Sequence, residues 1–83
     1  MPKVLENIKL VISHQLKIKN ESVTENSRIV DDLGADSLDV IELLSILEER
    51  FDVKIPSEKS DEITTIRDLE LYIEEKIEKK EKK

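Results

Sequence analysis

Residues 31–51, with the sequence DDLGADSLDVIELLSILEERF, contain a turn followed by a strongly patterned helix. Apolar side chains recur at helical spacing along this segment and fall on one stripe: Val40, Leu43, Leu44, Leu47 and Phe51. Gly34, the sole glycine of the chain, permits the turn, and Asp36 is a suitable N-cap. Asp39 adds a negative charge to the first helical turn, where the helix dipole favours it. The segment therefore predicts a helix over residues 37–51 whose apolar stripe faces a core.

Two further segments show helical spacing. Residues 3–17 form one, and the other begins near Thr65; their apolar positions are Val4, Ile8, Val11, Ile12 and Leu16, and then Ile66, Leu69, Ile73 and Ile77. Thr65 and Asp68 resemble a capping box with aspartate in place of glutamate, so they are expected to open the last helix. Ser57 follows Pro56 and could cap one short helical turn at residues 58–61.

The connection between the first two helices is long. Residues 20–28 are polar, which indicates a loop, and Ile29, Val30 and Leu33 are expected to pin this connection onto the core rather than form a strand. The sequence thus predicts an all-α fold, a small bundle of three main helices plus one short helix, with a long loop between the first and second main helices. The basic tail, residues 79–83, is expected to fray.

Composition narrows the possible functions. The length of 83 residues predicts a single domain, residues 1–83. A net charge of −6 disfavours nucleic acid and anionic membranes as partners and favours proteins with basic surfaces. The chain contains no cysteine, which excludes disulfides, a zinc–thiolate site and a cysteine nucleophile. The sequence has no apolar run of membrane-spanning length and no recognisable signal or transit peptide. We therefore expect a cytoplasmic protein without stable membrane insertion, unless a targeting segment has been removed.

The predicted second helix has a second face. Leu38 and Ile41 lie roughly opposite the core stripe, and the polar residues around them are Glu42, Ser45, Glu48 and Glu49. Two aliphatic side chains framed by carboxylates suit a basic partner that has an apolar pocket. The same pattern also fits a solvated face with two exposed aliphatic residues.

Ser37, at the start of this helix, permits three interpretations. It could simply help to begin the helix, as serine often does. It could be a hydrolase nucleophile, but the G-x-S-x-G elbow is absent and the sole histidine, His14, would have to act as the base. It could also carry a covalently attached phosphate-linked group, since the N-terminus of a helix favours an anion.

The segment over residues 32–39, DLGADSLD, strongly resembles the prosthetic-group motif of acyl carrier proteins. The resemblance extends over nearly the whole chain and is closest to the standalone bacterial-type carrier of type II fatty-acid synthesis. Further matching segments are Leu43-Leu44, Leu47-Glu48-Glu49, Phe51-Asp52, Ile55-Pro56 and Ile63-Thr64-Thr65-Ile66. Residues 1–83 then form a single acyl-carrier domain.

This resemblance implies that Ser37 receives 4′-phosphopantetheine from coenzyme A through a holo-carrier-protein synthase. The terminal thiol of that arm carries acyl chains as thioesters among the enzymes of fatty-acid biosynthesis, and the carrier itself, expected to be a monomer, catalyses nothing. The resemblance also implies a partner-binding surface for enzymes with basic docking surfaces, made of Asp36, Leu38, Asp39, Ile41, Glu42, Glu48 and Glu49. An acyl chain could be lined by Val30, Leu47, Ile55, Ile63 and Leu69, although these residues equally suit an ordinary core.

Some alternatives remain open. The cargo could be a polyketide, peptidyl or D-alanyl intermediate, or the chain could be a carrier-like structural adaptor. No specific metal site is expected, because Asp31, Asp32 and Asp36 lack EF-hand spacing. Four residues depart from the family pattern: Ser45 replaces a common exposed methionine, and Arg50, Lys54 and Lys59 stand where acidic residues are common. These departures leave the carrier role intact but put the affinity for partners and the choice of partner in doubt.

Overall fold

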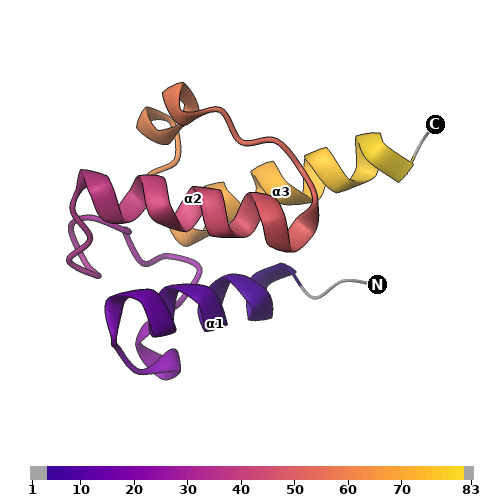
Figure 1. Cartoon of the computed structure of the whole chain (residues 1–83). Helices are drawn as coiled ribbons and strands as arrows, with labels where there is room; N and C mark the ends of the chain where they lie inside the picture. Colours follow the sequence, from indigo (N-terminus) through magenta and orange to yellow (C-terminus); the bar gives the residue numbers. More distant parts are fainter. Residues whose placement is uncertain (1–3, 82–83) are drawn as a thin grey trace.

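A computed structural model describes residues 4–81, and these residues form a helical fold without a β-strand (Figure 1). The three main helices are α1 (Val4–Leu16), α2 (Ser37–Phe51) and α3 (Ile66–Glu81). Two short 3₁₀ helices, η1 (Asn20–Ser22) and η2 (Ser57–Asp61), lie in the connections between them. The predicted all-α bundle is therefore confirmed, and η1 is an element that the sequence pattern did not predict.

The core lies where the apolar stripes of the three main helices meet, and α1 contacts both α2 and α3. The predicted stripe of α2 is confirmed, because Val40, Leu43, Leu44 and Leu47 are buried and Phe51 packs partly buried at its edge. The other main helices bury most of their predicted apolar positions: Val4, Ile8, Val11, Ile12, Ile66, Leu69 and Ile73. The core is thus aliphatic, and it fixes the orientation of α2 so that its opposite face is left to solvent.

The loop between α1 and α2 is attached to the start of α3 by backbone hydrogen bonds. The Ile29 N–H donates to the Thr64 carbonyl and the Ile66 N–H donates to the Ser27 carbonyl, each at 3.0 Å. The side chain of Ile29 is buried, whereas Val30 is 52% exposed. The prediction that Val30 packs onto the core is wrong, because the chain turns here, with the Asp32 N–H donating to the Arg28 carbonyl at 2.9 Å, and within this turn Ile29 is buried while Val30 is exposed.

The helix starts depend on short side chains. At α3, the Asp68 N–H donates to the Thr65 hydroxyl and the Thr65 N–H donates to the Asp68 carboxylate, each at 3.1 Å, which confirms the predicted capping box. The N–H groups of Thr65 and Thr64 lower the pKa of Asp68. At η2 the N-cap position is Pro56, so the prediction that Ser57 caps this turn is wrong. The turn starts one residue earlier than the sequence pattern indicated.

The C-terminal end of α2 is held by α3. Asp52 follows α2 in the left-handed backbone region, with φ of 55°. The Lys80 ammonium donates to the carbonyl and to the carboxylate of Asp52, and it lowers the pKa of that carboxyl. The helix α3 continues through Glu81, and the rest of the basic tail, residues 82–83, lies outside the described residues. Within residues 4–81, no helix combines the length and the apolar character needed to cross a membrane.

Candidate attachment site and docking face

Ser37 is the first residue of α2, and its side chain is exposed. The capping role at this helix belongs to Asp36, whose carboxylate accepts the Asp39 N–H at 2.8 Å. Asp39 returns the interaction by accepting the Asp36 N–H at 3.2 Å, so the two residues form a complete capping box. The Ser37 hydroxyl makes no hydrogen bond with the residues that the structure describes. It is therefore free for chemistry at the positive end of a helix.

The geometry around Ser37 fits a covalently attached phosphate group. Unpaired N–H groups and the dipole at a helix N-terminus favour an anion. The carboxylates of Asp36 and Asp39, which flank Ser37 in the sequence, are already held by backbone N–H groups. A phosphoester on Ser37 would extend from the surface without displacing any hydrogen bond of the capping box.

The nucleophile interpretation lacks a base. His14 is exposed on α1 and lines a groove that extends to Arg50 in the last turn of α2. Ser37, in the first turn, is not among the residues that line this groove. In residues 4–81, no group of three or more His, Asp or Glu side chains is arranged to hold a metal ion.

The outer face of α2 has the predicted arrangement. Leu38 is 69% exposed and Ile41 is 46% exposed, opposite the buried stripe. Glu42, Ser45 and Glu49 are also exposed. The structure thus brings the two predicted aliphatic residues and several predicted acids to one solvent-facing side of the helix that begins with Ser37.

The acids of this face differ in how they are used within the fold. Asp36 and Asp39 cap the helix, and Glu42 accepts a hydrogen bond from the Gln15 amide on α1 at 2.9 Å. Glu48 is half-buried, and its carboxylate accepts the Ile55 N–H at 2.6 Å. Glu49 makes no hydrogen bond or ion pair with a described residue. Glu49 is therefore the acid whose charge is most available to a partner.

A cavity of about 300 Å³ adjoins this face. Its walls come from α2 and from the segment that precedes η2, and its lining consists of Ile41, Leu44, Ser45, Glu48, Ile55 and Pro56. Of the residues that could line an acyl chain, Ile55 does line this cavity, whereas Val30 is exposed elsewhere. Leu47, Ile63 and Leu69 belong to the buried core.

The sequence of the chain is similar to a known protein family and to a named protein. Residues 6–73 match the protein family described as "Phosphopantetheine attachment site". The chain is also similar to a protein of Wolinella succinogenes named "Acyl carrier protein". The two are 48% identical over 71 residues, which cover 86% of this chain and 93% of that protein.

Proposed function

The chain belongs to the family of acyl carrier proteins, whose cofactor is 4′-phosphopantetheine, and we propose that Ser37 is the residue that carries this group. The observation that supports this assignment most strongly is the exposed Ser37 hydroxyl at the start of α2. Asp36 caps the helix, so the Ser37 hydroxyl is not needed as a capping group. When bound, the group supplies the terminal thiol that the cysteine-free chain lacks.

We further propose that the protein carries acyl chains among enzymes of fatty-acid biosynthesis in the cytoplasm, as one acyl-carrier domain without catalytic activity. The apolar and acidic face of α2, with Leu38, Ile41 and Glu49, suits enzymes that have basic docking surfaces. Such encounters are fast and weak, because a shuttle must release each partner. The cavity between Ile41 and Ile55 offers apolar walls for part of an acyl chain.

The attachment residue is tested by intact-mass spectrometry after incubation of the apo-protein with coenzyme A and a carrier-protein synthase. The wild-type chain should gain one phosphopantetheine group, and Ser37→Ala should gain none. Ser45→Ala is a matched control, because Ser45 is an exposed serine on the same helix, and this variant should be modified like the wild type. Equal modification of Ser37→Ala and the wild type would contradict the assignment.

The docking face is tested with Glu49→Lys, which reverses a charge without removing a described hydrogen bond. We expect slower acyl transfer by a basic partner enzyme at low salt, with a weaker dependence of the rate on ionic strength. Glu21→Lys makes the same change in net charge on η1 and should have a smaller effect. Glu48→Lys is a less clean variant, since it also removes the acceptor of the Ile55 N–H. Equal rates for Glu49→Lys and the wild type at low salt would contradict this surface.

A further inference from the structure

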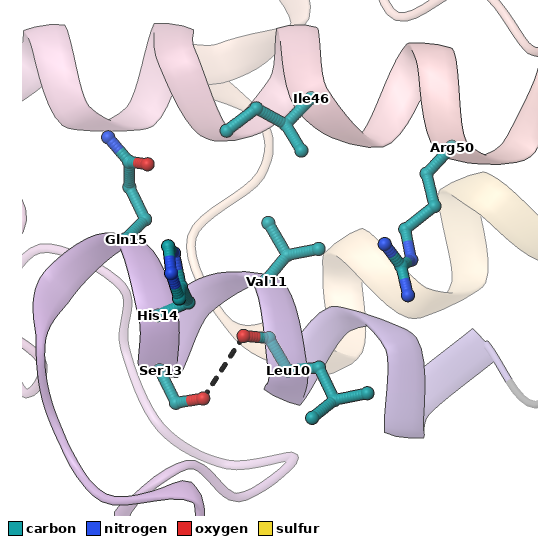
Figure 2. A pocket seen from close by; sticks show the side chains of 7 residues that line it. All are labelled: Leu10, Val11, Ser13, His14, Gln15, Ile46 and Arg50. Atoms are coloured by element: carbon teal, nitrogen blue, oxygen red, sulfur yellow. Dashed lines mark hydrogen bonds between the residues drawn. The ribbon is translucent and has the colours of Figure 1, made fainter.

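A second groove lies between α1 and α2. It has a volume of about 540 Å³, and Figure 2 shows the side chains that line it: Leu10, Val11, Ser13, His14, Gln15, Ile46 and Arg50. Around α2, Arg50 lies about 180° from Ile41 at the helical rotation of roughly 100° per residue. The Arg50 end of the groove therefore faces away from Ile41, whereas Ile46 lies about 40° from Glu42 around α2, so the middle of the groove borders the acidic edge of the docking face.

The middle of the groove is apolar. Val11 is buried at its base, while Leu10 is 54% exposed and Ile46 is 38% exposed. In Figure 2, Val11 points from α1 toward Ile46 on α2, and the Leu10 side chain extends sideways over α1 below Val11, so both helices contribute apolar groups to the groove. Covering Leu10 and Ile46 would remove apolar surface from water, which favours association.

Polar side chains lie at both ends of the groove, and Arg50 places a positive charge at one of them. Arg50 lies at one end, and His14 lies with Gln15 at the other (Figure 2). The Arg50 Nε donates to the Asn7 side-chain oxygen at 2.8 Å, which orients the guanidinium, and neither Nη atom bonds to a described residue. Among residues 4–81, no carboxylate lines the groove, although the chain has a net charge of −6, and the nearby Glu42 is held by Gln15.

We propose that this groove binds an amphipathic helix of a partner protein, one that presents aliphatic side chains flanked by carboxylates. An aliphatic side chain would lie between Leu10 and Ile46, and a carboxylate would pair with Arg50, in the manner of a helix laid into a groove. The exposure of Leu10 favours a helix over a small molecule, because small-molecule sites are concave pockets that bury most of their ligand. Such a partner would leave Ser37 and the Leu38 and Ile41 side of α2 accessible to enzymes, because neither Ser37, Leu38 nor Ile41 lines the groove.

The test uses the full-length, ¹⁵N-labelled protein and two synthetic helical peptides that share one leucine stripe, flanked by glutamate in one peptide and by lysine in the other. Backbone amide shifts are followed by NMR at an ionic strength of about 0.15 M, where repulsion by distant charges is screened beyond about 8 Å. The glutamate peptide should shift the amides near Leu10 and Ile46. The lysine peptide should instead shift those near Leu38 and Ile41.

Two variants locate the interaction. Arg50→Glu should weaken binding of the glutamate peptide by about fivefold, the effect of an exposed ion pair, and Leu10→Ser should weaken it by a similar factor. Both replace exposed side chains, and thermal unfolding checks that each variant folds. Unchanged affinity in both folded variants, or shifts confined to the Leu38 and Ile41 face, would overturn the proposal. It would also be overturned if sedimentation showed self-association that Arg50→Glu abolishes, because a second copy would then be the occupant.

Discussion

Replacing Asp36 with alanine removes the side chain that caps α2 immediately before Ser37. The Asp36 carboxylate accepts the Asp39 N–H at 2.8 Å, and without it this N–H loses its partner at the exposed helix end. Loss of an aspartate N-cap costs about 1 kcal/mol. For a domain of this size, that loss lowers the melting temperature by about 4–8 °C. Asp36→Asn keeps a side-chain oxygen for the cap, so it should lose less than half as much stability, mainly through the helix dipole.

The assay is urea unfolding followed by far-ultraviolet circular dichroism at pH 7. Asp31→Ala is the control, because Asp31 forms only an exposed ion pair with Arg28 at 3.7 Å and should change stability by less than about 0.5 kcal/mol. In the synthase assay, Asp36→Ala should be modified more slowly than Asp36→Asn, since the turn that presents Ser37 frays. If the alanine and asparagine variants were equally stable, Asp36 would not act as a cap and the reasoning about the free Ser37 hydroxyl would be refuted.

Three other predictions concern stability. Leu47 is fully buried, so Leu47→Ala should cost about 2–5 kcal/mol in urea unfolding, whereas the exposed Ile41→Ala should cost far less; similar losses would contradict the described core. Burial and the neighbouring Glu25 raise the pKa of Glu70, so ionised Glu70 weakens folding above that pKa. Glu70→Gln should therefore be more stable than the wild type at pH 7, and this gain should vanish near pH ~4 in a pH series of thermal melts. The pKa of Asp68 is lowered, so its contribution is present at pH 7 and lost as the pH falls through that lowered value. Asp68→Asn should accordingly be less stable at neutral pH, and a difference from the wild type that did not shrink in acid would exclude this role.

Helical periodicity was sufficient to predict the three main helices and the buried stripe of α2. Each of these helices carries its apolar residues on one face, and that face packs against the core. The loop between α1 and α2 carries no such periodicity. Its conformation depends on hydrogen bonds to residues far along the chain, such as the bond from the Ile29 N–H to Thr64. The outward position of Val30 and the short helix η1 therefore could not be predicted from local sequence.

The candidate site was predictable to a similar extent. The position of Ser37 at a helix start and the exposure of Leu38 followed from the pattern, and the spacing of Asp36 and Asp39 could have indicated the capping box. The hydrogen bonds of Glu42 and Glu48 could not be predicted, since their partners belong to other segments that packing brings close. The sequence therefore predicted the outward position of Glu42 and Glu49, but not that Glu48 is half-buried or that Glu42 and Glu48 also support the fold.

The most direct test of the central proposal is mass spectrometry of the protein isolated from its source, on the intact chain and on its proteolytic peptides, before and after hydroxylamine treatment, which cleaves thioesters. We expect a chain that bears one phosphopantetheine group on Ser37, with linear acyl chains that hydroxylamine releases. An unmodified chain, a group attached to another serine, or an aminoacyl or peptidyl cargo on the arm would contradict it.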